Sequence, residues 1–173
     1  RAADFINAKN RPMRIHEDLI VFSPAPMGHV SLLGDRRMVY FPQGVRATNK
    51  IERRKTSKFG SITGDRPSHT KEYLRLSTNY PKSVLEFASV PSPLHPTQKP
   101  VPLLSYLIRT YTHKGDTVLD FCMGSGSTLV ACIEEGRNGI GIERDAGYFE
   151  IAKKRIEHEQ TKPRTMRMEL APP

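Results

Sequence analysis

The stretch Thr117-Val-Leu-Asp-Phe-Cys-Met-Gly-Ser-Gly-Ser-Thr128 decides the fold of this chain. A short apolar run ends in the carboxylate of Asp120, and a loop with two glycines follows at once. Ser127 and Thr128 then open an apolar segment, residues 129–133, with the character of a helix. A strand, a glycine turn and a helix N-terminus in this order suit a ligand that contacts backbone N–H groups, because glycine lets the main chain approach closely.

Helix and strand patterns continue on both sides of this stretch. Apolar residues at helical spacing after Pro102 predict a helix upstream. The helix that follows the glycine loop should stop at Gly136, and the sequence Gly139-Ile-Gly-Ile-Glu143 predicts a second parallel strand ending in a carboxylate. A further amphipathic helix is expected to end near Gln160. Residues 101–160 therefore predict the βαβ core of a doubly wound α/β sheet.

The remaining segments have weaker patterns. The apolar run at residues 19–22 lies between acids and prolines and predicts a buried strand. Short strands are also expected at residues 38–41 and 84–87, the latter within a segment rich in proline. The basic tail, residues 161–173, is expected to fray.

The composition is that of a globular protein of one domain. Of the 173 residues, 37% are hydrophobic and 26% are charged, and no apolar run approaches the roughly 18 residues of a membrane span. Cys122 and Cys132 provide neither a disulfide framework nor the spacing of a metal site, so a reducing, cytoplasmic setting is expected. The chain starts at Arg1 without an opening signal, which suggests a fragment or a processed chain.

Positive charge is concentrated in one segment. The net charge is +9, and residues 46–75 hold nine Lys and Arg against three acids, a balance of 9 − 3 = +6. Such a cluster favours a polyanion, most often nucleic acid, although a solvated basic loop without a partner is the alternative. Residues 45–80 otherwise lack periodicity, so we expect a loop-rich insertion with little core of its own.

Three ligands share a glycine turn after a strand. A P-loop requires a lysine before its Ser or Thr, and here Ser127 and Thr128 follow Gly126 directly. A dinucleotide site would place a small residue where Leu129 stands. S-adenosylmethionine is the third candidate, because its adenosine binds a Rossmann-like sheet without a pyrophosphate to hold.

Two carboxylates are placed for this third ligand. Glu143 lies at the predicted end of the next strand, where a carboxylate can accept hydrogen bonds from both ribose hydroxyls. Asp120 ends the first strand and is placed to meet the amino-acid end of the ligand. A helix cap at Asp120 and a surface acid at Glu143 remain the alternatives, and the paired placement favours the site.

Three motifs in this order resemble those of amino-group DNA methyltransferases: His95-Pro-Thr-Gln-Lys-Pro100, then residues 120–128, then residues 139–143. The order is similar to that of the permuted beta group, and the variant Phe121-Cys-Met-Gly124 resembles adenine-N6 enzymes of phages and prophages. The tail from Tyr148 to Ile156 and the segment from Arg11 to Ser23 resemble the same family. The resemblance implies a partial, permuted, Rossmann-like sheet of an S-adenosylmethionine-dependent methyltransferase.

The resemblance also implies roles for individual residues. The cofactor pocket would be lined by residues of the glycine loop and of the motif before it, with Glu143 on the ribose and Lys99 on the cofactor carboxylate. These residues are Thr97, Gln98, Lys99, Asp120, Phe121, Gly124, Ser125, Gly126, Thr128 and Glu143. His95 is expected to be structural, since methyl transfer from a sulfonium needs no imidazole base. No metal ligand is expected.

The same likeness divides the chain into parts. Residues 1–44 and 81–160 would form the methyltransferase core, residues 45–80 a target-recognition insertion, and residues 161–173 a tail. Double-stranded DNA would be contacted by the basic insertion, with Arg53, Arg54, Lys55 and Lys58 as the expected DNA-binding residues.

The catalytic motif of this family, which is Asp, Asn or Ser followed by Pro-Pro and an aromatic residue, is absent from the chain. In that motif a carbonyl and a polar side chain hold the exocyclic amine of a flipped base. We therefore expect the C-terminal portion of an adenine-N6 methyltransferase, inactive without an N-terminal part and with no catalytic residue of its own. Cytosine-N4 methylation, a non-catalytic binding subunit that needs a partner chain and, less well, a small-molecule methyltransferase are the alternatives, and the sequence is silent on oligomeric state.

Overall fold

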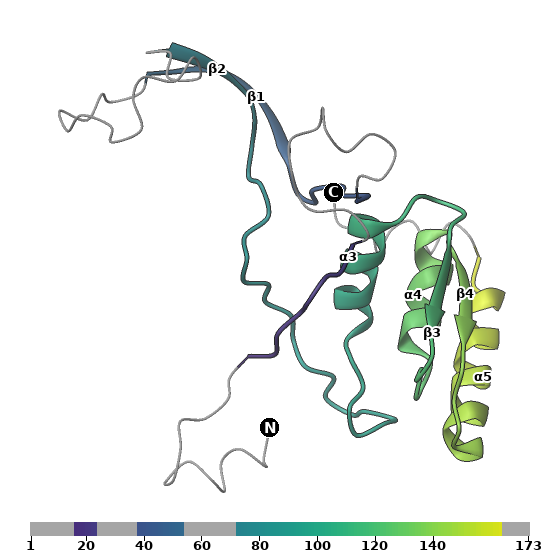
Figure 1. Ribbon diagram of the computed structural model, residues 1–173. Coiled ribbons are helices and arrows are strands. Elements are labelled where there is room, and N and C mark those ends of the chain that lie inside the picture. Colours follow the sequence, from purple (N-terminus) through teal and green to yellow (C-terminus); the bar gives the residue numbers. More distant parts are fainter. Residues whose placement is uncertain (1–15, 24–37, 54–71, 164–173) are drawn as a thin grey trace, which may run out of the picture. The chain divides into compact units, whose positions relative to one another are not determined.

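The computed structural model describes residues 16–23, 38–53 and 72–163 (Figure 1). The chain divides into two compact units, residues 1–38 and residues 39–173. All helices and strands of the described residues belong to the second unit.

In the first unit, residues 16–23 form an irregular segment. Its apolar side chains face solvent, with Ile20 73% and Phe22 89% exposed. The prediction of a buried strand at residues 19–22 is therefore wrong. A strand is stabilised by its ladder to a neighbour, and none of the residues that the structure describes pairs with this segment.

The core of the second unit alternates helices and strands in the predicted order. Its elements are α3 (Val101–Tyr111), β3 (Thr117–Asp120), α4 (Ser127–Glu135), β4 (Asn138–Gly141) and α5 (Ala146–Thr161). The two strands are parallel, with Thr117 opposite Asn138 and Asp120 opposite Gly141. The predicted α/β order is thus confirmed, although β4 ends at Gly141 and Glu143 lies in the loop after it.

One face of the β3–β4 pair packs against α4. Val118 lies against the buried cluster of Ile108, Ala131 and Cys132, and burial raises the pKa of the Cys132 thiol to about 11. A Cβ atom at Gly141 would lie within 3.0 Å of the Leu129 side chain, so glycine on this face of β4 allows the close approach of α4.

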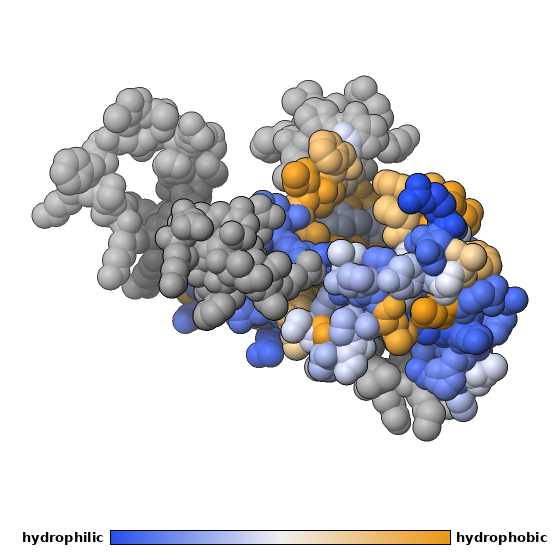
Figure 2. Space-filling view, turned by 90° about the horizontal axis from the view of Figure 1, so that it is seen from below, coloured by the Kyte–Doolittle hydropathy of each residue, from blue (hydrophilic) through white to orange (hydrophobic). Residues whose placement is uncertain are grey.

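The opposite face of this small sheet is apolar and exposed. Leu119 is 58% exposed and Ile140 is 54% exposed. Figure 2 shows that hydrophobic side chains reach the molecular surface on the face it displays. Parallel sheets are normally covered on both faces, and within the described ranges only the α4 side of β3 and β4 is covered.

The helix ends follow from local chemistry. A proline lies in the first turn of α3, and Asp145 caps α5 by accepting a hydrogen bond from the backbone N–H of Tyr148 at 2.9 Å. Helix α4 begins after Gly126 and ends before Gly136, both in the left-handed conformation. No helix in the described part of the chain is long and apolar enough to cross a membrane.

Arginines join α3 to the C-terminal end of α4. Arg109 forms an ion pair with Glu135. Arg137 donates to the carbonyl and hydroxyl oxygens of Thr112 at 2.8 and 3.0 Å, and to the Glu135 carbonyl at 2.6 Å. These contacts satisfy carbonyl groups at the helix ends that have no partner within the helix.

The segment that was expected to be a basic insertion, residues 45–80, contains a β-ribbon. Strands β1 (Arg46–Arg53) and β2 (Glu72–Thr78) are antiparallel, so the prediction of a loop-rich segment is wrong for these residues. Cross-strand contacts explain the pairing, because Ile51 faces Leu74 and Glu52 forms an ion pair with Arg75 at 2.9 Å. The expectation of little core is confirmed here, since Ile51 is 65% exposed and Leu74 55% exposed.

The two other predicted strands are wrong, because residues 38–41 and 84–87 are irregular. Aromatic side chains connect them to α3 and the residues after it. The rings of Phe41 and His113 lie edge to face, with their centroids 5.2 Å apart. The backbone N–H of Phe41 donates to the Thr110 carbonyl at 2.8 Å. The Phe87 ring meets Tyr106 at 6.1 Å. The large side chains of these segments therefore make aromatic contacts rather than pack in a strand.

Candidate functional site

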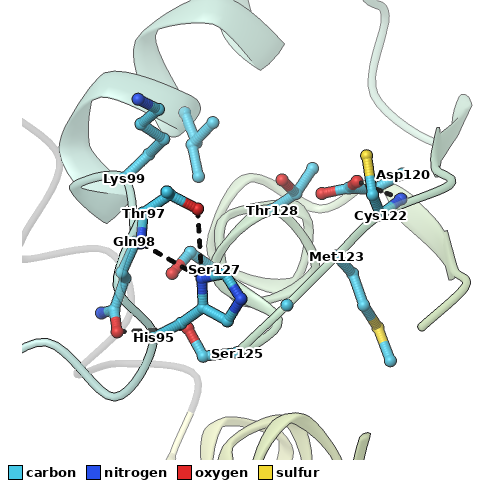
Figure 3. A pocket seen from close by; sticks show the side chains of 12 residues that line it. His95, Thr97, Gln98, Lys99, Asp120, Cys122, Met123, Ser125, Ser127 and Thr128 are labelled. Carbon is cyan, nitrogen blue, oxygen red and sulfur yellow. Dashed lines mark hydrogen bonds between the residues drawn. The ribbon is translucent and has the colours of Figure 1, made fainter. Parts of the chain in front are cut away.

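A cavity of about 190 Å³ lies between the glycine loop and the segment before α3 (Figure 3). It is lined by His95, Thr97, Gln98, Lys99, Leu104, Asp120, Cys122, Met123, Gly124, Ser125, Ser127 and Thr128. Two segments that are separated by more than 20 residues in the sequence thus form one site.

Seven of the ten residues predicted for the cofactor line this cavity: Thr97, Gln98, Lys99, Asp120, Gly124, Ser125 and Thr128. The other three lie next to it in the chain or in space. Phe121 is 74% exposed, Gly126 is the N-cap of α4, and Glu143 is hydrogen-bonded to Gly124.

The sequence prediction missed five lining residues: His95, Leu104, Cys122, Met123 and Ser127. Ser127 could have been found from its place in the first turn of a predicted helix, and Cys122 and Met123 from lying inside the loop. Leu104 points into the site only because α3 packs beside α4, which the sequence did not reveal.

The loop turns at two glycines in the left-handed region. Gly124 has φ of +51° and Gly126 has φ of +75°, values that other residues adopt only with strain. A Cβ atom at Gly124 would lie 3.3 Å from the His95 ring, and one at Gly126 would lie 3.0 Å from the Ala152 Cβ. Glycine is therefore required at these positions both for conformation and for space.

His95 fills the space beside Gly124. Its ring meets Tyr148 of α5 edge to face at 4.3 Å, and its Nδ1 accepts a hydrogen bond from the Thr97 N–H at 3.2 Å. These contacts hold the His95 ring between the glycine loop and α5.

Gln98 connects the two segments of the cavity. Its Oε1 accepts hydrogen bonds from the Leu94 N–H at 2.8 Å and from the Ser125 hydroxyl at 3.1 Å (Figure 3). Ser125 is only 2% exposed, so this link between the loops is shielded from competing water.

Both carboxylates of the site hold the local backbone. Glu143 accepts from the N–H of Gly124 at 2.8 Å and from that of Asp145 at 2.9 Å. The Asp145 N–H first, and then that of Gly124, hold the pKa of Glu143 below its usual value. Asp120 accepts from the Cys122 N–H at 3.1 Å. Each carboxylate oxygen has two lone pairs and can accept a further hydrogen bond from a ligand.

The N-terminus of α4 faces the same site. The first hydrogen bond of the helix runs from the Val130 N–H to the Gly126 carbonyl at 3.1 Å. The N–H groups of Ser127, Thr128 and Leu129 precede it and have no acceptor within the helix. Together with the helix dipole they provide a positive end that favours an anionic or polar group in the cavity.

The predicted DNA-binding residues are largely outside this description. Arg54, Lys55 and Lys58 lie outside the described residues, and Arg53 is the last residue of β1, opposite Glu72. Among the residues that the structure places, no group of three or more His, Cys, Asp or Glu could hold a metal ion.

Comparisons with known proteins give a family match and several partial relatives. The family model described as DNA methylase, N6_N4, matches residues 5–154. The Type II methyltransferase M.HpaI of Haemophilus parainfluenzae is 33% identical over 144 residues, which cover 83% of this chain and 39% of that protein. M.BglI of Bacillus subtilis is 48% identical over 63 residues, which cover 36% of this chain and 18% of that protein. This chain thus spans less than half the length of these relatives.

Solved structures overlap the chain in part. The M1.HpyAVI–SAM complex is 40% identical over 53% of this chain and 42% of its own, with a TM-score of 0.39. The putative DNA modification methylase TTHA0409 of Thermus thermophilus, complexed with S-adenosyl-L-methionine, is 24% identical over 69% of this chain and 56% of its own, with a TM-score of 0.35.

The loop geometry makes a testable prediction for Gly126. Gly126→Ala should lower the free energy of unfolding by more than Gly136→Ala, because both residues have positive φ but only a Cβ at Gly126 meets another side chain. Backbone strain should cost each variant about 1–2 kcal/mol, and contact with Ala152 should add to the cost at Gly126. Urea denaturation followed by circular dichroism would measure both.

The control is the double variant Gly126→Ala/Ala152→Gly, which removes the opposing methyl group and should recover part of the loss. Equal destabilisation at Gly126 and Gly136 would show that the approach of α5 to the loop is unimportant for stability.

Proposed function

The chain belongs to the N6_N4 DNA methylase family, and we propose from this premise that its cavity binds S-adenosylmethionine for methyl transfer to an exocyclic amine in DNA. The observation that carries the proposal is the glycine loop between two carboxylates, Asp120 and Glu143, at the N-terminus of α4. A parallel strand followed by such a turn is where a Rossmann-like sheet holds an adenosine ligand.

The residues of the site fit this cofactor. Glu143 is held ionised beside the loop by two backbone N–H groups and would accept hydrogen bonds from the ribose. Lys99 would pair with the cofactor carboxylate, and Asp120 would meet the α-amino group. The absence of a Cβ at Gly124 lets the His95 ring lie against the loop, at the wall of the cavity that both residues line.

We propose the following roles for the remaining predicted residues. Thr97 and Gln98 would close over the methionine end. Ser125, Gly126 and Thr128 would form the floor with the first turn of α4, and Phe121 would lie along the adenosine. Bound S-adenosylmethionine supplies the electrophilic methyl group, while this chain binds and orients it.

The acceptor would be adenine N6, with cytosine N4 as the close alternative. The order of the motifs along the chain supports the permuted beta group, and the sequence Phe121-Cys-Met-Gly124 supports the adenine type. The tetrapeptide that would hold the amine is not among these 173 residues. We propose that residues outside them, N-terminal in the same enzyme, supply it.

The exposed sheet face supports this division of the enzyme. Leu119 and Ile140 present apolar side chains on the side of β3 and β4 away from α4. Since parallel sheets bury both faces, further polypeptide on this side would complete the sheet.

The basic β-ribbon is proposed as the DNA-recognition element. Residues 46–75 carry two thirds of the net charge of the chain, and Lys50 lies opposite Arg75 on one face of the ribbon. The major groove of DNA admits a two-stranded β-ribbon, so both the charge and the shape support this role.

Cofactor binding can be tested at Glu143. Isothermal titration calorimetry with S-adenosylmethionine should show binding, and a 2′-deoxyribose analogue should bind wild type roughly tenfold or more weakly, as expected for a hydrogen bond to a charged group. In Glu143→Ala the two ligands should bind with equal affinity, because the variant has no carboxylate to accept a hydrogen bond from the 2′-hydroxyl.

Asp145→Ala is the matched control, since it removes a nearby carboxylate that caps α5. The ribose preference should survive there. An equal penalty for the deoxy ligand in wild type and Glu143→Ala would remove Glu143 from the ribose role, and no binding to wild type would contradict the proposed function.

Methyl transfer can be tested with duplex DNA and radiolabelled cofactor. The 173-residue chain alone should transfer no methyl group, whereas a chain extended upstream to include the catalytic tetrapeptide should be active. Mass spectrometry of the digested DNA would distinguish N6-methyladenine from N4-methylcytosine. Activity of the isolated chain would contradict the division proposed above, and inactivity of both chains would favour a non-catalytic binding subunit.

DNA binding by the basic segment, residues 45–80, can be tested through its salt dependence. Replacing Arg53, Arg54 and Lys55 with Gln should reduce the slope of log K against log salt by up to about 0.9 for each lost phosphate contact. The same charge change at three exposed lysines of the core, Lys114, Lys153 and Lys154, should leave the slope close to that of wild type. An equal reduction in both variants would show that net charge alone, and not the basic segment, attracts DNA.

A further inference from the structure

Arg155 of α5 contacts the glycine loop from the side of this helix. Its Nη1 atom donates to the Ser125 carbonyl at 2.5 Å, to the Ser125 hydroxyl at 3.0 Å and to the Ser127 hydroxyl at 3.2 Å. Both serines line the cavity and are buried. The guanidinium group itself is half-buried, and burial lowers its pKa, although arginine remains charged at neutral pH.

The contact extends through Ser125 to the other wall of the cavity. The Ser125 hydroxyl accepts from Arg155 and donates to Gln98 Oε1 at 3.1 Å. Gln98 in turn accepts from the Leu94 N–H at 2.8 Å. One chain of hydrogen bonds thus joins α5, the glycine loop and the segment before α3.

The packing of α5 supports the same arrangement. Ala152 lies three residues before Arg155, on the same side of the helix, and is fully buried. Its Cβ would be 3.0 Å from a Cβ at Gly126. Ala152 therefore packs against Gly126, and Arg155 donates a hydrogen bond to the carbonyl of Ser125. Because both sides of the Ser125–Gly126 peptide are contacted, this peptide has little freedom to rotate.

We propose that Arg155 is a positioning residue for the cofactor: it orients the Ser125–Gly126 peptide so that the first N–H groups of α4 face the cavity before the ligand arrives. This proposal rests on the proposed function. A loop held in its binding conformation avoids the ordering cost that a mobile loop would add to binding, and the charge of Arg155 adds to the positive end of α4.

If Arg155 only stabilised the fold, its acceptors would not need to be residues that line the cavity. Arg137 is a useful comparison, because it also makes three hydrogen bonds, to Thr112 and the Glu135 carbonyl, at the opposite end of α4. None of those acceptors lines the cavity. All three acceptors of Arg155 belong to residues that do.

The test compares Arg155→Met, Arg155→Lys and the matched control Arg137→Met. Calorimetry with S-adenosylmethionine, at a temperature where each variant is folded by circular dichroism, should show affinity reduced roughly tenfold or more in Arg155→Met. Arg155→Lys should recover part of it, because lysine keeps the charge and can still donate to the Ser125 carbonyl. Arg137→Met should lower the melting temperature and leave the affinity unchanged.

A second measurement needs no ligand. Hydrogen–deuterium exchange of the unliganded chain should show faster exchange in Arg155→Lys at Gly126 and Val130, whose N–H groups donate to the carbonyls of Met123 and Gly126. The amides of α3 should exchange as in wild type. This readout decides the proposal if Arg155→Met fails to fold, or if wild type fails to bind S-adenosylmethionine. If wild type fails to bind S-adenosylmethionine, the proposed function is contradicted. The exchange rates of the loop amides would still decide whether Arg155 positions the loop.

Two results would overturn the proposal. One is wild-type affinity in a folded Arg155→Met variant. The other is exchange that rises equally across α3, α4 and the glycine loop in Arg155→Lys, which would show that Arg155 only stabilises the fold.

Discussion

The close approach of α5 to the glycine loop is the constraint on which the site depends. Gly126 has φ of +75°, and the Ala152 methyl group fills the space beside it where a Cβ atom would otherwise lie. Because the chain turns here without a side chain, α4 can start directly after the strand loop, with its free N–H groups at the cavity. The turn at Gly124 also requires glycine, because the His95 ring occupies the space that a Cβ atom would need.

The polar residues of the site support the loops around it and keep capacity for further hydrogen bonds. Glu143 accepts two backbone N–H groups and so joins the glycine loop to the loop after β4, while its remaining lone pairs stay available to a ligand. Asp120 does the same within its own turn. The sequence left a helix cap as the alternative at Asp120 and a surface acid as the alternative at Glu143. In the structure both carboxylates hold backbone N–H groups, which leaves each with capacity for a further hydrogen bond.

Outside the core, local patterns predicted the wrong elements for a common reason. The runs at residues 19–22, 38–41 and 84–87 are apolar and short, but a strand exists only where a second strand offers a ladder. The basic segment showed the opposite error. Ile51 and Leu74 alternate with charged residues too irregularly to signal strands, yet their pairing across the ribbon forms β1 and β2.

The sequence by itself determined the helix–strand–helix–strand–helix order of residues 101–160 and most of the residues that line the cavity. These features depend on local periodicity, on the glycines of the loop and on motifs whose members lie close in the chain. Only the tertiary structure decided which segments meet: His95 against Gly124 and Tyr148, Gln98 on Ser125, and Arg155 on both serines of the loop. Such contacts depend on how helices pack on the sheet, and the spacing of residues along the chain carries no record of that packing.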